Sequence, residues 1–153
     1  MATQTRYIIP ALGRIWDSLD GYAWAVLRIA YGAWYIPHGM QKLFGAFGGG
    51  AVSGTAAFFD KVGYSPGIFW GTLVGCTEFF GGILLVLGLL TRPVAGMFAV
   101  FMYVAAFHFN ILRGYFWTKG GMEMPLLLLA IAIVILVRGG AEYSLDRKMG
   151  REF

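Results

Sequence analysis

The stretch of sequence that decides the fold is PGIFWGTLVGCTEFFGGILLVLGLL, from Pro66 to Leu90. Its only acidic or basic side chain is Glu78. At the ~1.5 Å rise per residue of an α-helix, a run of this length crosses the ~30 Å hydrocarbon core of a bilayer. Gly71, Gly75 and Gly82 share a helix face with Glu78, and small residues on one face let a second helix approach closely. We therefore expect a membrane helix whose Glu78 faces other helices and not lipid.

The composition of the whole chain is also typical of a membrane protein. Of its 153 residues, 58% are hydrophobic and 13% are charged, whereas a soluble domain has about 45–50% apolar and about 25% charged residues. The length allows one compact domain. The net charge of +4 lies mostly in the tails and short loops, so we interpret it as a topology signal and expect no nucleic-acid partner. A single cysteine, Cys76, excludes an internal disulfide.

The chain has three further apolar runs, and together the four runs predict an all-α, integral membrane four-helix bundle surrounded by the lipid bilayer. The spans are expected at about 21–40, 66–90, 93–110 and 123–137. Within an N-terminal segment 1–20, apolar residues at helical spacing over 8–19 predict a short amphipathic helix on the membrane surface. The four-helix transmembrane domain is then 21–138, and a basic tail follows at 139–153.

The connections between the expected spans differ in length. The turn from Leu90 to Pro93 is tight, so the second and third spans should form an antiparallel hairpin. The Gly-rich stretch 45–54 and a short helix at 55–62 form the longest connection, which is a candidate lid or docking surface. Pro37 should bend the first span or end its regular hydrogen bonding. Ser65 should cap the second span.

Basic residues predict the orientation of the chain. Four spans place both termini on one side, and the turn between the second and third spans lies there too. That side carries seven basic residues, namely Arg6, Arg14, Arg92, Arg138, Arg147, Lys148 and Arg151. The opposite side carries four, namely Lys42, Lys61, Arg113 and Lys119. Because basic residues accumulate in cytoplasmic loops, we expect both termini in the cytoplasm.

Ionisable side chains inside or at the rims of the spans form the candidate site. They are Arg28, His38, Lys42, Glu78, His108 and Glu123. A charge at the centre of a membrane helix costs at least ~2.5–3.5 kcal/mol, so such groups are normally paired, hydrated or functional. Arg28 lies ten residues before His38, or ~15 Å below it, and Glu78 lies twelve residues after Pro66, or ~18 Å below the same outer surface, so the two reach similar depths. We therefore predict an Arg28–Glu78 ion pair as the floor of a polar pocket open to the outer side.

The same residues could instead have purely structural roles. The Arg28–Glu78 pair could serve only to hold helices in register, and Lys42 could simply extend to the interface. Glu123 could cap the fourth helix. His38 and His108 on separate helices could bind a metal, but HxxxH and HxxE spacings are absent, so no metal site is predicted.

The order of these motifs resembles that of the DoxX family of small four-helix membrane proteins. The matching stretches are Leu27-Arg28-Ile29, His38 to Gly45, Glu78 with Gly81-Gly82, Gly88 to Arg92, Glu123-Met124-Pro125 and Tyr143 to Asp146. The resemblance implies a four-helix membrane fold in a bacterial or archaeal plasma membrane. It also implies association with membrane redox complexes, such as a thiosulfate:quinone oxidoreductase or a terminal quinol oxidase.

These features together favour a redox-associated subunit of a quinone-linked oxidoreductase. It would bind a quinone or another small molecule in the outer-facing pocket, where His38 and Glu123 would exchange protons with the head group. No motif for haem, flavin or an iron–sulfur cluster is present, so electrons would come from a protein partner or a mobile carrier. The alternatives are a non-catalytic scaffold, docked to a partner or to further copies of the chain, and a small transporter gated by Arg28–Glu78. No inverted repeat supports the transporter.

Overall fold

The computed structural model describes residues 7–152 and is helical throughout, with no strand in that range. Its α-helices are α1 (Pro10–Phe44), α2 (Ala51–Lys61), α3 (Gly67–Cys76), α4 (Gly82–Leu87), α5 (Thr91–Val104), α6 (Glu123–Arg138) and α7 (Leu145–Lys148). Two π-helical segments extend this set: η2 (Thr77–Gly81) joins α3 to α4, and η3 (Ala105–Asn110) continues α5. Short 3-10 turns are η1 (Ala46–Gly48), η4 (Ile111–Arg113) and η5 (Trp117–Lys119). Arg6, which the orientation argument counted, lies outside the described residues.

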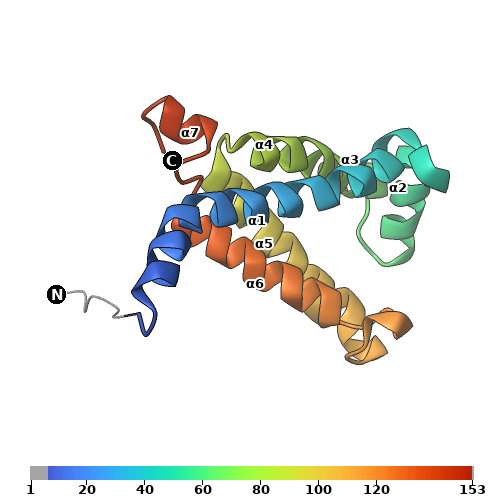
Figure 1. Ribbon diagram of the computed structural model, residues 1–153. Coiled ribbons are helices and arrows are strands. Elements are labelled where there is room, and N and C mark those ends of the chain that lie inside the picture. The colour runs from blue at the N-terminus through green and yellow to red at the C-terminus, as the bar shows by residue number, and fades with distance from the viewer. Residues whose placement is uncertain (1–6, 153) are drawn as a thin grey trace.

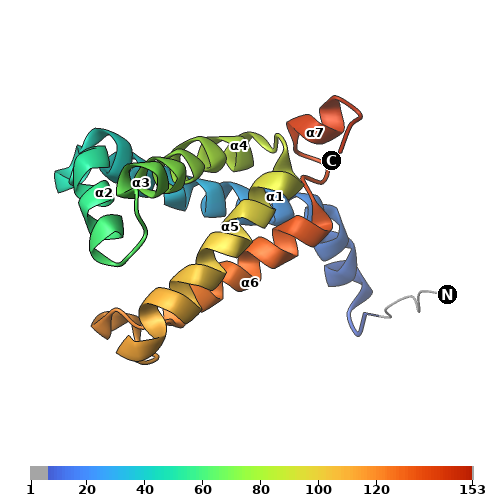
Figure 2. The ribbon, with the colours of Figure 1, turned by 180° about the vertical axis from the view of Figure 1, so that it is seen from behind.

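The helices form two arms that diverge from a common end (Figure 1). In one arm, α1 lies alongside α3 and α4, and α2 packs across the far end. The other arm is the antiparallel pair α5 and α6, which Figure 2 shows side by side from behind. The arms meet at the turn between α4 and α5, next to α7 (Figure 1).

Two continuous helical stretches are long and apolar enough to cross a membrane. They are Gly67–Leu87, which runs through η2, and Thr91–Arg113, which runs through η3. Helix α6 has 16 residues, fewer than the ~20 that a regular span needs. Helix α1 is long enough but carries five charged residues. The all-α fold class is therefore confirmed, and two of the four expected spans are supported by length and composition.

Helix α1 corrects two predictions. The separate surface helix at 8–19 is wrong, because that segment and the first span form one continuous helix of 35 residues, bent in its N-terminal part (Figure 1). Gly21 at the expected boundary costs a helix only ~1 kcal/mol, which is too little to end it. The first span also extends past its expected end at about residue 40, and Pro37 lies inside it, since an interior proline removes one backbone hydrogen bond and leaves the others. The helix ends at Phe44, where Gly45 adopts φ 72°.

The start of α3 differs from the prediction as well. Pro66 occupies the N-cap position, and Ser65 does not cap the helix. The carboxylate of Asp60 instead accepts the N–H of Gly67 at 2.7 Å. The cap therefore comes from the end of α2, and it holds the first turn of α3 against that helix.

Glycines bring α1 into backbone contact with the opposite helix. A Cβ atom added to Gly39 would lie 2.6 Å from the Cα atom of Phe79, and one added to Gly32 would lie 2.6 Å from the carbonyl oxygen of Gly82. Membrane helices approach this closely only where residues are small. These contacts set an antiparallel register that places Gly32 opposite Gly82 and Gly39 opposite Phe79.

This packing predicts that Gly39→Ala destabilises the protein by about 1–3 kcal/mol, because the added methyl group overlaps the backbone of Phe79. Unfolding in mixed SDS and dodecylmaltoside micelles, followed by circular dichroism, measures the change. Gly54→Ala in α2 is the matched control, since a Cβ atom there meets no heavy atom within 4 Å. It should be neutral or stabilising by up to ~1 kcal/mol. Equal stability of Gly39→Ala and the unmodified protein would contradict the close contact.

Candidate functional site

A cleft of about 780 Å³ lies between the two arms. It is lined by Trp34, Tyr35, His38 and Lys42 of α1, Glu78 of η2, Met102 of α5, Asn110 of η3, Trp117 of η5, and Met124, Pro125 and Leu128 of α6. Of the residues predicted from the sequence, His38, Lys42 and Glu78 come together here. Arg28, His108 and Glu123 are not among the lining residues.

Lys42 and Glu78 form an ion pair on the α1 side of the cleft. The ammonium nitrogen of Lys42 donates to Oε2 of Glu78 at 2.5 Å. The lysine side chain is 29% exposed and the glutamate side chain 9%, so the lysine is the partner that can reach a molecule in the cleft. Gly39, one turn before Lys42, lets the two backbones approach closely enough for this pair to form. A carboxylate this deeply buried would be costly without such a partner.

Both π-helical segments border the cleft, and each contributes one polar side chain. Glu78 belongs to η2 and Asn110 ends η3, so the two residues come from different arms. A π turn adds one residue to a helical turn and so changes where the following side chains point; such turns are frequent at functional sites. The two departures from regular α-helix therefore coincide with the polar positions of the cleft.

Aromatic side chains form much of the remaining wall. Tyr35 is 3% exposed, and its hydroxyl lies 3.4 Å from that of Tyr31, which donates to the carbonyl of Leu128 at 3.0 Å. These hydrogen bonds link α1 to α6 beside the cleft. In the cleft wall, the ring of Trp34 lies beside that of His38, with 6.0 Å between centroids.

Sequence reasoning missed Trp34, Met102, Asn110 and Trp117 as cleft residues. Asn110 did carry a signal, because an amide at the end of an apolar run needs hydrogen-bond partners. The aromatic residues carried none. They make up 17% of the chain, and most of them are explained by packing alone.

Arg28 does not pair with Glu78, so the central prediction from the sequence is wrong. The arginine is fully buried, and its guanidinium donates to the carbonyls of Leu85, of Val86 at 3.0 Å and of Tyr143 at 2.5 Å. The carbonyls of Leu85 and Val86 belong to the C-terminal end of α4, where partial negative charge favours a cation. Arg28 therefore joins α1, α4 and the segment before α7, and its role is structural.

The reason for this error is the register of the helices. The depths were counted from His38 and Pro66, taken to lie at the same outer surface, but α1 continues to Phe44. The antiparallel contacts place Lys42 beside Glu78. Arg28, fourteen residues earlier in the same helix, is then displaced by roughly 21 Å along the helix axis.

Asp146 completes the junction around Arg28. It is 1% exposed, and its carboxylate accepts the N–H groups of Leu90 at 2.8 Å and Thr91 at 2.9 Å, at the start of α5. Its own N–H donates to the carbonyl of Gly88 at 2.9 Å. The segment Tyr143 to Asp146 thus fastens the turn between the two arms.

His108 and Glu123 have partners outside the cleft. The exposed His108 ring packs edge-on against Tyr64, with 5.5 Å between centroids. Glu123, the first residue of α6, accepts the N–H of Trp117 at 3.0 Å and so closes the preceding loop. Within residues 7–152, no three His, Cys, Asp or Glu side chains are grouped so as to hold a metal ion.

Comparisons with known proteins point to one family. The model of the DoxX family matches residues 23–111, a range that contains the Lys42–Glu78 pair and both π-helical segments. A protein of Bacillus subtilis (strain 168) named "Putative oxidoreductase CatD" is 28% identical over 121 residues, which are 79% of this chain and 82% of that protein. No solved structure matches the chain.

The hydrogen bonds of the buried Arg28 predict that Arg28→Lys destabilises the protein by about 2–5 kcal/mol. The single ammonium group of a lysine cannot replace a planar guanidinium that donates to carbonyls on two separate segments. The same change should speed chymotrypsin cleavage at Tyr143. Arg14→Lys, at an exposed position of α1, is the control and should change neither quantity. Unchanged stability and unchanged cleavage in Arg28→Lys would show that the arginine does not hold this segment.

The ion pair predicts coupling between Lys42→Met and Glu78→Gln. A double-mutant cycle on the free energy of unfolding should give an interaction of about 0.5–3 kcal/mol. The exposed pair Arg92–Glu152, with 3.2 Å between charged atoms, is the control and should give about 0–1 kcal/mol. Additive effects at Lys42 and Glu78 would argue against the pair.

Proposed function

Because the chain belongs to the DoxX family, we propose that it is a redox-associated membrane subunit that binds a quinone, or a similar flat oxidisable molecule, between its two arms. The observation that carries this proposal is the Lys42–Glu78 ion pair in a cleft whose remaining walls are mostly aromatic and apolar. A few well-placed polar groups in an apolar pocket are typical of small-molecule sites. The name of the Bacillus subtilis relative, "Putative oxidoreductase CatD", supports the redox class.

The lining of the cleft suits a quinone head group. Its volume of about 780 Å³ is within the ~300–1,000 Å³ usual for small-molecule pockets. Trp34 and Trp117 offer faces for a flat ring. Lys42, His38 and Asn110 carry the donors that carbonyl oxygens of the head group would accept. When bound, a quinone would supply the capacity to take up two electrons and two protons.

Within this proposal the charged residues of the cleft act on the head group. Lys42 donates a hydrogen bond, and its positive charge stabilises negative charge that develops on an oxygen of the ligand. Glu78 keeps the lysine in place. His38, exposed near Lys42 on α1, is the group that can exchange protons near neutral pH. Arg28 does not act on the head group in this proposal, because its guanidinium already donates to backbone carbonyls.

Electrons must reach the cleft from outside the chain. The sequence has no motif for haem, flavin or an iron–sulfur cluster, so a protein partner or a mobile carrier is part of the proposal. We also propose a plasma membrane location with both termini in the cytoplasm. The arms diverge away from α7 (Figure 1), and in this orientation the cleft would open toward the outer side.

The proposal predicts saturable quenching of tryptophan fluorescence when a short-chain ubiquinone is added to the purified protein in detergent. Trp34→Phe with Trp117→Phe should remove the saturable part, whereas Trp16→Phe, outside the cleft, should keep it. Lys42→Met should weaken binding by about ten- to a hundredfold, because a charge-assisted hydrogen bond is lost. Lys61→Met in α2 is the matched control and should bind normally.

Two results would reject this function. One is the absence of saturable quenching in the unmodified protein. The other is equal binding by Lys42→Met and Lys61→Met, which would place the quinone away from the ion pair.

A further inference from the structure

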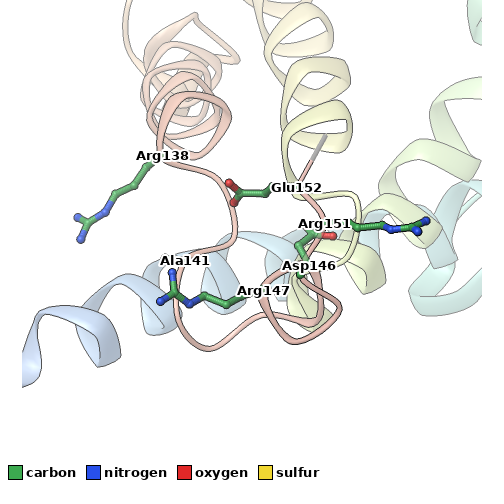
Figure 3. Close-up of a pocket in the computed structure, with 7 residues that line it drawn as sticks. Arg138, Ala141, Asp146, Arg147, Arg151 and Glu152 are labelled. Carbon is green, nitrogen blue, oxygen red and sulfur yellow. The ribbon is translucent and has the colours of Figure 1, made fainter.

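The two arms touch again at a distance from their junction. At the junction, the carboxylate of Asp146 accepts N–H groups at the start of α5 (Figure 3). Farther along, α2 and the loop after it lie on the side of the first arm that faces α5 (Figure 2). Aromatic rings of this region meet rings of η3 in the second arm. We call this contact the aromatic clasp, and its members are Phe58, Phe59, Tyr64, His108 and Phe109.

Tyr64 is the central ring of the clasp. Its centroid lies 5.7 Å from that of Phe109 and 5.5 Å from that of His108, both in the other arm. Phe59, the buried residue of α2, lies 6.1 Å from Tyr64 and 6.3 Å from Phe109. The N–H of Tyr64 donates to the carbonyl of Phe59 at 2.8 Å, which fixes the tyrosine to the end of α2. Interacting aromatic pairs have separations of this size.

The clasp and the cleft share the π-helical segment η3. Phe109 and Asn110 are consecutive residues there, yet the ring of Phe109 meets the first arm and Asn110 lines the cleft. No member of the clasp lines the cleft. A π turn holds one residue more than an α turn, so the direction of both side chains depends on this winding. A rearrangement of η3 that withdraws Phe109 from the clasp therefore also turns Asn110.

A second aromatic contact joins the arms on the junction side of the cleft. The ring of Phe98 in α5 lies 4.2 Å from that of Tyr35 and 5.8 Å from that of Tyr31, both in α1. Along the second arm, the cleft residue Met102 falls between Phe98 and Phe109. The clasp is thus the outer of two contacts that set the width of the cleft.

We propose that the aromatic clasp regulates the cleft by positioning Asn110 for the ligand, with Tyr64 as the positioning residue. The inference rests on the proposed function, because the ligand is the quinone head group. When the clasp is closed, the amide of Asn110 reaches the head group. When it opens, the amide turns away and the arms separate. Because the closed form alone offers this donor, ligand binding and closure favour each other.

The first test needs no ligand and measures the separation of the arms in the full chain in detergent. Nitroxide labels at Lys61→Cys in α2 and Lys119→Cys in η5, both exposed positions, are placed in a Cys76→Ser background. Double electron–electron resonance gives the distance between them. Tyr64→Ala should lengthen or broaden this distance, whereas Tyr64→Phe, which keeps the ring, should not. An unchanged distance in Tyr64→Ala overturns the proposal.

The second test measures binding of a short-chain ubiquinone by tryptophan quenching. Tyr64→Ala should weaken binding by about three- to tenfold, because a neutral hydrogen bond to the ligand is lost, and Tyr64→Phe should bind normally. In an Asn110→Leu background, Tyr64→Ala should cause no further loss. Phe69→Ala is the matched control, since this exposed ring of α3 contacts Trp70 of its own arm, and it should bind normally.

The outcomes separate this inference from the proposed function. Absence of saturable quenching in the unmodified protein rejects the proposed function and this inference with it. With normal binding in the unmodified protein, unchanged binding by Tyr64→Ala overturns the inference alone. Additive losses from Tyr64→Ala and Asn110→Leu also overturn it, because the tyrosine then acts without the amide. So does an equal loss in Phe69→Ala, and circular dichroism checks that each variant is folded.

Discussion

The fold depends on one buried guanidinium. Arg28 lies at the junction of α1, α4 and the segment before α7, and it satisfies carbonyls that the end of α4 leaves without partners. In the same way, the carboxylate of Asp146 accepts the N–H groups at the start of α5, which lack partners within that helix. The two residues together hold the arms at one end, so that the other ends are free to diverge. These two buried charges act as structural devices, because they satisfy backbone groups at helix ends.

The register that Arg28 and the glycines impose also creates the candidate site. With Gly39 against Phe79, Lys42 comes to lie beside Glu78. The π-helical segments η2 and η3 then direct Glu78 and Asn110 into the space between the arms. A polar pair in an aromatic cleft is thus a consequence of how the helices approach each other.

The sequence predicted the helices better than their contacts. The apolar runs located α3 with α4, α5 and α6. The antiparallel hairpin expected of the second and third spans is wrong, because α4 and α5 belong to different arms that diverge from the turn between them, and α5 packs against α6 instead (Figure 1). The surface helix at 8–19 was wrong because Gly21 is only a weak helix breaker, and the cap at Ser65 was wrong because Asp60 reaches the helix from outside. His38, Lys42 and Glu78 do line one cleft. Trp34 and Trp117 could not be told from packing residues, because nothing in a sequence distinguishes a ring facing a cleft from a ring facing lipid.

By itself, the sequence determined the helical class, the membrane-type composition and the set of ionisable residues that the apolar segments contain. These follow from local properties, namely hydropathy, spacing and turn chemistry. Only the tertiary structure decided that Glu78 pairs with Lys42 and that Arg28 binds backbone carbonyls. The partner of a buried charge depends on the register between helices far apart in the chain. A difference of a few turns in that register, set by glycine contacts and by where α1 ends, changes every such pair.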